Sequence, residues 1–145
     1  MKKTLVTLSL SVALLACAED RSSVDKLEKE VFSIHDEVMP QSSKLMELQE
    51  QVSQDVATTD SLVKRSPNPT LEKRKADGLA IAEALKDADG AMMDWMHNYQ
   101  GDSLKTLKVA AAMPYLETEK TKINVVRDKM LQSMNRAQKF LDSNP

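Results

Sequence analysis

The chain has 145 residues, with 20 Lys and Arg against 22 Asp and Glu and a formal net charge of −2 at pH 7. Both signs of charge are interspersed and no basic stripe could bind phosphates, which argues against a nucleic-acid partner. A single cysteine excludes an internal disulfide, and only three glycines in a chain rich in Ala, Leu, Lys and Glu predict long helices.

Residues 1–16 have the order of features found in an export signal. Lys2 and Lys3 supply positive charge, residues 4–15 form an uncharged run rich in Leu and Val, and the small Ala16 precedes Cys17. The run is too short for a permanent helix across about 30 Å of hydrocarbon, so it predicts a signal that is cleaved. Cleavage removes two lysines and leaves 18 basic against 22 acidic residues, a net charge of −4.

The segment Leu14-Leu15-Ala16-Cys17 resembles the lipobox of bacterial lipoproteins. That resemblance implies a diacylglycerol on the Cys17 sulfur and a further acyl chain on the new amine, which together anchor a protein stably. The alternative is an ordinary signal peptide that leaves Cys17 as a free thiol. Asp after the lipidated cysteine is the inner-membrane retention signal in well-studied sorting systems, so Ala18 implies the outer membrane. Residues 17–22 would be a polar tether with a reach of at most about 18 Å.

A helical domain is predicted over residues 23–145, beginning with a long helix. Its apolar residues follow the alternating three- and four-residue spacing of a seam that faces a partner helix: Val24, Leu27, Val31, Ile34, Val38, Leu45, Leu48 and Val52. A second row beside this seam consists of Phe32, Met39 and Met46 and predicts two buried edges. Pro40 is expected to kink this helix without ending it, because the seam resumes in phase.

The Ser66-Pro67-Asn68-Pro69 segment predicts the first turn, with Thr70 capping a second helix that ends at Gly101. The seam of this second helix is Gly78, Ile81, Leu85, Ala88, Met92, Trp95 and Tyr99. The secondary structure of residues 102–113 is ambiguous, although the spacing of Leu104, Leu107 and Ala111 suits a short helix that packs across one end of the bundle. Pro114 is expected to open a third long helix, which is lined by Leu116, Ile123, Val126, Met130, Met134, Ala137 and Leu141.

These elements predict an all-α fold, an antiparallel three-helix bundle with long helices and room for a short fourth helix at one end. The alternative is an extended coiled coil that dimerises through the same seams, so a monomer and a homodimer both stay open. The chain contains no GxSxG, Gly-rich phosphate loop, HExxH or CxxCH motif. We therefore expect a non-enzymatic protein.

One group of residues suggests chemistry, because it contains both histidines of the chain with several methionines. His35 and Met39 are four residues apart, as are Met93 and His97, and Met96 lies beside the second pair. Antiparallel folding about the Pro-rich turn puts His35 opposite a residue between Met93 and Tyr99. Imidazole with thioether suits Cu(I) or Ag(I), and Trp95 could offer its ring face to the cation. The alternatives are ordinary packing of flexible methionines, His97 facing water, a groove for a partner helix, and haem held by a Met/His pair.

The segments 34–40 (IHDEVMP) and 91–99 (AMMDWMHNY) resemble a group of small bacterial lipoproteins of unknown function. Automatic labelling often calls that group "viral A-type inclusion protein". The resemblance implies an exported, lipidated helical protein and carries no catalytic residues. The leading hypothesis is accordingly a lipid-anchored protein of the cell envelope that acts as a helical interaction or structural module for an unidentified envelope protein. The alternative is a Cu(I)- or Ag(I)-binding protein on the periplasmic side.

Overall fold

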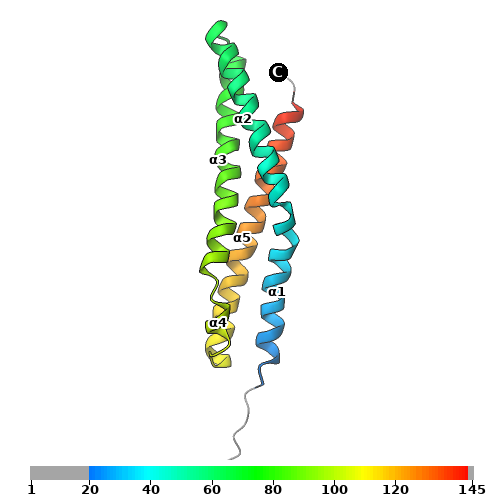
Figure 1. Cartoon of the computed structure of the whole chain (residues 1–145), viewed down its shortest axis with the longest axis vertical. Helices are drawn as coiled ribbons and strands as arrows, with labels where there is room; N and C mark the ends of the chain where they lie inside the picture. Colours follow the sequence, from blue (N-terminus) through cyan, green and yellow to red (C-terminus); the bar gives the residue numbers. More distant parts are fainter. Residues whose placement is uncertain (1–19, 144–145) are drawn as a thin grey trace, which may run out of the picture.

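The computed structural model describes residues 20–143, and these residues form an antiparallel bundle of three long helical arms (Figure 1). The first arm consists of α1 (Ser22–Val38), a 3-10 turn η1 (Met39–Gln41) and α2 (Ser42–Arg65). The second arm is α3 (Pro69–Asn98) and the third is α5 (Val109–Asp142), with the short α4 (Gly101–Leu104) between them. The predicted all-α three-helix bundle with a short fourth helix at one end is confirmed.

We call the end where α1 begins and α4 lies the proximal end, and the end with the α2–α3 turn the distal end (Figure 1). The sequence predicts a helical domain that begins at residue 23, and the first helix, α1, begins at Ser22. The predicted signal peptide and Cys17 lie outside the described residues. No helix within residues 20–143 combines the length and the apolar character needed to cross a membrane.

Pro40 interrupts α-helical geometry without ending the first arm, as predicted. Proline has no N–H to donate to the Asp36 carbonyl, and the chain passes through η1 before α2 begins. The skipped position of the seam, Gln41, is exposed and lies in this turn. Val38 before the turn and Leu45 after it are both fully buried, so the apolar seam continues across the interruption.

The turn at residues 66–68 is where predicted, but its capping residue is not Thr70. Asn68 is the N-cap of α3, because its side chain accepts a 2.8 Å hydrogen bond from the Thr70 N–H, and Pro69 occupies the first helical position. Proline is well suited to that position because its missing donor would have no helical partner there. Two later seam residues, Ile81 and Leu85, are buried as expected.

Two predicted helix boundaries are wrong at the proximal end. The second arm ends at Asn98, and Gly101 begins α4 instead of ending α3. The third arm begins at Val109, so Pro114 lies inside α5. A proline this near the start of a helix removes one donor, to the carbonyl four residues before it, and burial of Ala112 favours the helical course of this segment.

The core follows the predicted seams, with some departures. Met46 of the predicted second row is exposed and Phe32 is 38% exposed, so the first arm does not bury two complete edges. On α5, Phe140 is buried, whereas its neighbour Leu141 is only partly buried. The α5 seam also includes two buried polar residues that the apolar pattern passed over, Glu119 and Ser133.

Arg21 fixes the entry of the chain into the bundle. Its guanidinium donates to the Leu107 carbonyl and, at 3.0 Å, to the Leu104 carbonyl, both in the corner between α4 and α5. Carbonyls after a short helix lack helical partners, so a guanidinium with several donors satisfies them well. Beside it, Asp20 accepts a 2.9 Å hydrogen bond from the Ser22 N–H at the start of α1. Arg21 belongs to the predicted tether, yet it is held against the bundle.

Candidate functional site

The proximal half contains a cluster of rings, which we call the aromatic cluster: Phe32, His35, Trp95, Tyr99 and Tyr115. It lies where α1 and α3 do not pack closely, although both pack against α5. Phe32 meets Tyr99 edge-on at 5.1 Å between ring centroids, and Trp95 lies 5.3 Å from Tyr99. Edge-to-face pairs at such distances are favourable. Large rings therefore bridge a separation that smaller side chains would leave open.

His35 is the centre of the polar contacts in the aromatic cluster. Its side chain is 16% exposed, and its Nδ1 lies 2.9 Å from Asp36 Oδ1. Its Nε2 lies 3.4 Å from the Met96 Sδ across the α1–α3 separation. The Trp95 ring lies 5.6 Å from the imidazole with an angle of 32° between the planes. His35 thus stands opposite residues 95 and 96, within the window predicted from the length of the arms.

The other predicted metal-binding residues are distributed over different surfaces. Met39 is partly buried against the core and lies in η1, where its Sδ accepts a 3.8 Å contact from the Ser42 hydroxyl. Met93 is 54% exposed and His97 is also exposed, both on the outer part of α3. Of the five residues, the structure brings together His35 and Met96. Cys17, the predicted lipidation site, lies outside the described residues.

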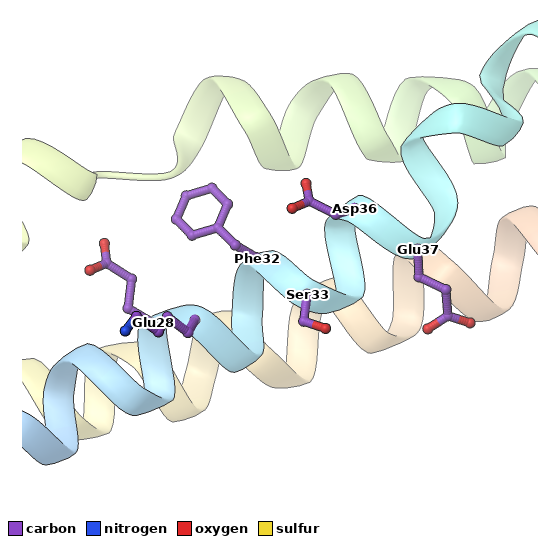
Figure 2. A pocket seen from close by; sticks show the side chains of 6 residues that line it. Glu28, Phe32, Ser33, Asp36 and Glu37 are labelled. Atoms are coloured by element: carbon purple, nitrogen blue, oxygen red, sulfur yellow. The ribbon is translucent and has the colours of Figure 1, made fainter.

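Asp36 is the residue at this site that sequence reasoning missed. Adjacent residues on a helix point about 100° apart, so helical spacing alone gives no reason to pair His35 with Asp36. The carboxylate nonetheless reaches back to the ring because both side chains point toward α3. Figure 2 shows Asp36 and Phe32 projecting from the side of α1 that faces α3. The His-Asp dipeptide was the available signal.

Two tyrosines of the aromatic cluster are partly buried and have hydrogen-bonded phenols. Tyr99 donates to Glu28 Oε1 at 3.2 Å, and burial followed by the nearby Glu28 charge raises the pKa of Tyr99 far above its ordinary value. Tyr115 accepts a 2.7 Å hydrogen bond from the Gln100 N–H, and burial raises the pKa of Tyr115 as well. Both phenols therefore stay protonated and act as neutral hydrogen-bonding groups.

The Trp95 indole is the least satisfied polar group in this region. The residue is only 6% exposed, and its Nε1 is the one buried side-chain nitrogen or oxygen without a hydrogen-bond partner within residues 20–143. A buried donor without a partner lowers stability by about 1–3 kcal/mol. The ring faces of Trp95 are in contact with His35 and Tyr99. The indole of Trp95 therefore contributes ring contacts while its Nε1 has no hydrogen-bond partner.

The surface beside the aromatic cluster is hollowed but open. One hollow follows α1 alone, lined by Glu28, Lys29, Phe32, Ser33, Asp36 and Glu37 (Figure 2). A hollow with walls from a single helix cannot enclose a small substrate, because enclosure buries most of a ligand's surface. The described part of the chain also has no group of three or more His, Cys, Asp or Glu residues arranged to hold a metal ion.

Comparisons with known proteins give no match to a protein family model, to a curated protein or to a solved structure. The resemblance to small bacterial lipoproteins therefore stays a prediction. The function of this chain has to be inferred from its own residues and contacts.

Proposed function

We propose that this protein is a non-enzymatic, lipid-anchored protein of the cell envelope, most simply of the outer membrane, whose bundle presents a protein-binding surface away from the bilayer. The observation that carries the proposal is the short distance along the chain between Cys17, in its lipobox-like setting, and Ser22, where α1 begins. A tether of this length holds the proximal end within about 18 Å of a lipid on Cys17.

The direction of the bundle supports a role at a distance from the membrane. Its proximal end would face the bilayer, and α3 with its 30 residues extends about 45 Å from there toward the distal end. Near the distal end, Leu62 and Leu79 are exposed by 36% and 52%. A shallow hollow beside them is lined by Val63, Glu72, Lys75, Ala76 and Leu79. A contiguous exposed apolar patch rimmed by polar residues is typical of a surface that binds another protein, and these two leucines beside the hollow are the candidate for such a patch.

The lipid anchor is tested by mass spectrometry of the chain isolated from membranes of the native host. We expect a product that begins at Cys17 and carries two or three acyl chains, and a Cys17→Ser variant without them. A mature chain that keeps an unmodified Cys17 thiol, or that is released from membranes without detergent, would overturn the proposal.

The binding surface is tested by placing a photo-crosslinking amino acid at position 79 of the full chain in living cells. We expect one reproducible protein adduct, which decreases when an untagged wild-type copy competes for the partner and stays unchanged when the competing copy carries Leu79→Glu. Leu131→Glu is the matched control and should compete as the wild type does, because Leu131 is also exposed (41%) but belongs to α5. Adducts only with a second copy of this chain, or competition by the Leu79→Glu copy as strong as that by the wild type, would contradict a distal partner site.

A further inference from the structure

We propose that His35 and Met96 form a binding site for a soft monovalent metal ion, Cu(I), with the Trp95 ring beside the ion. This site is independent of the proposed anchor and partner surface, since it lies in the proximal half and involves neither Cys17 nor Leu79. It narrows the predicted His/Met set to the two residues that the fold brings together.

The protonation of His35 follows from its contact with Asp36. A carboxylate can only accept, so the 2.9 Å contact with Nδ1 requires the proton on that nitrogen. The neutral ring then has its lone pair on Nε2, the atom that faces Met96. A thioether sulfur has no hydrogen to donate. In that tautomer two lone-pair donors face each other across 3.4 Å, and a metal ion can bind both.

The distances allow both atoms to bind one ion. Metal ions lie about 2.0 Å from an imidazole nitrogen and about 2.3 Å from sulfur, which at the observed separation of 3.4 Å corresponds to an angle of roughly 105° at the metal. Two-coordinate Cu(I) favours a wider angle, so binding requires the Met96 side chain to rotate and increase the nitrogen–sulfur separation. Methionine has three rotatable bonds and adapts readily.

The surroundings of the two ligands resemble those of established metal sites in two respects. A histidine ligand almost always donates its other N–H to a carboxylate or carbonyl, which fixes the ring and makes it more basic; Asp36 does this for His35. A cation near an aromatic face is stabilised by the electrons of the ring, most strongly by tryptophan. The Trp95 and His35 ring centroids are 5.6 Å apart, so an ion bound to His35 would lie beside the indole.

The donor set selects the kind of ion. Thioether sulfur binds Cu(I), whereas Mg²⁺ and Ca²⁺ require oxygen ligands. Zn²⁺ is usually held by three or four nitrogen, thiolate or carboxylate ligands, and no group of three such residues is arranged for it within residues 20–143. Ag(I) shares the preference of Cu(I) for soft ligands and serves as an air-stable probe. An ion bound here would also link α1 to α3, which do not pack closely at this level.

The test is an anaerobic titration of the full chain with Cu(I) in the presence of a competing chromogenic Cu(I) chelator. A Cys17→Ser background in mild detergent removes the one thiol that would bind the ion by itself. We expect one Cu(I) per chain and quenching of the Trp95 fluorescence at the same stoichiometry, by Ag(I) as well as by Cu(I). Zn²⁺ at the same concentrations should leave the fluorescence unchanged.

Met96→Leu is the decisive variant, because it removes the sulfur and nearly conserves the volume of the side chain. It should weaken Cu(I) binding by at least about tenfold, and Asp36→Ala by about tenfold through loss of the hydrogen bond that orients the ring. Met93→Leu and His97→Gln are the matched controls on the same helix and should bind as the parent does. Equal binding by the parent and Met96→Leu, or retention of all Cu(I) by the chelator, would overturn the site.

The tautomer of His35 gives an independent measurement on the metal-free chain. Two-bond ¹H–¹⁵N correlation should show a protonated Nδ1 and an unprotonated Nε2, with the Nε2 signal shifting when Ag(I) is added. A proton on Nε2 at neutral pH would mean that the contact with Met96 is an ordinary weak hydrogen bond to sulfur, and the proposed coordination would then be wrong.

Discussion

The distal and proximal halves of the bundle are held together by different means. In the distal half, α2 and α3 approach closely at Gly78, where an added Cβ would lie 2.5 Å from Val56 Cγ2 and 3.0 Å from Phe140 Cζ. In the proximal half, α1 and α3 stand apart and aromatic rings fill the space between them. Close backbone packing holds the distal half together, whereas the proximal half contains a buried donor without a hydrogen-bond partner, the Trp95 Nε1, and the contact between His35 Nε2 and Met96 Sδ.

The distal half also contains the best-formed ion pair of the bundle interior. Arg74 donates to both carboxylate oxygens of Asp55, at 3.1 and 2.7 Å, and its guanidinium lies 4.4 Å above the Phe140 ring. Bidentate pairs of this kind are geometrically specific. The contacts of Arg74 with Asp55 and Phe140 link all three arms, since Asp55 belongs to α2, Arg74 to α3 and Phe140 to α5. The arms are therefore linked by a bidentate ion pair in the distal half and by ring contacts in the proximal half.

Of the substitutions considered, Gly78→Leu should lower the stability of the bundle most, because the new side chain must displace the stiff Val56 and the Phe140 ring. We expect the free energy of unfolding to fall by about 3 kcal/mol, measured by urea denaturation. Gly90→Ala is the control, because nothing lies within 4 Å of its added Cβ; it should raise stability by up to about 1 kcal/mol through helix propensity. Equal effects of the two changes would mean that α2 and α3 are not closely packed at Gly78.

Arg74→Met should have the next largest effect. The Arg74 side chain is 11% exposed and that of Asp55 is 24% exposed, so the change leaves a partly buried carboxylate without its partner. We expect the free energy of unfolding, measured by urea denaturation, to fall by about 2 kcal/mol, which lies between the values for buried and exposed ion pairs. Lys73→Met tests the specificity of this effect, because the Lys73–Asp77 pair is on the surface; its effect should stay within about 0.5 kcal/mol.

Phe32→Leu tests the proximal half. The change removes the edge-to-face contact between Phe32, which is 38% exposed, and Tyr99. We expect the free energy of unfolding to fall by about 1 kcal/mol. Amide hydrogen exchange should accelerate in α1 more than in α2, because the rings connect α1 to α3. Met46→Leu, at an exposed position of α2, should change neither measurement. Uniform acceleration over the whole bundle would argue against separate packing of the two halves.

The smallest effect concerns acid stability at the distal end. Hydrogen bonds from Lys64 and Lys75 lower the pKa of Asp60 to about 2. A lowered pKa in the folded state stabilises the fold above the ordinary value near 4, and that contribution is lost as the pH falls toward 2. The urea midpoints of the wild type and Asp60→Asn should therefore differ slightly above pH 4 and converge near pH 2. With Lys64→Gln and Lys75→Gln already present, Asp60→Asn should have no pH-dependent effect.

The arms of the bundle could be predicted because burial determines them. Leu27, Leu48 and Leu85 occupy the spacing that a helix requires to keep one apolar face inside, and all three are buried. The exact ends were less predictable. Proline is found most often at the first position of a helix. Pro114 nonetheless lies inside α5, which begins five residues earlier at Val109, because a proline in the early turns removes only one hydrogen bond.

The height of the candidate site was predictable, but the directions of its side chains were not. Counting equal numbers of residues from the turn at residues 66–68 along both arms puts His35 opposite residues 93–99. A rotation of 100° per residue then separates Met96, which faces α1, from His97, which faces outward. Which of the two meets His35 depends on the rotation of α3 about its own axis, set by packing of Met92 and Trp95 in the core.

The contact of Arg21 with the corner between α4 and α5 has a mechanical consequence. If Cys17 carries a lipid, any tension from the membrane enters the bundle through residue 21, which is connected to α1 by the chain and to the Leu104 carbonyl by a hydrogen bond. The load is then shared between the first and third arms and shears them along their length, instead of peeling α1 away one turn at a time.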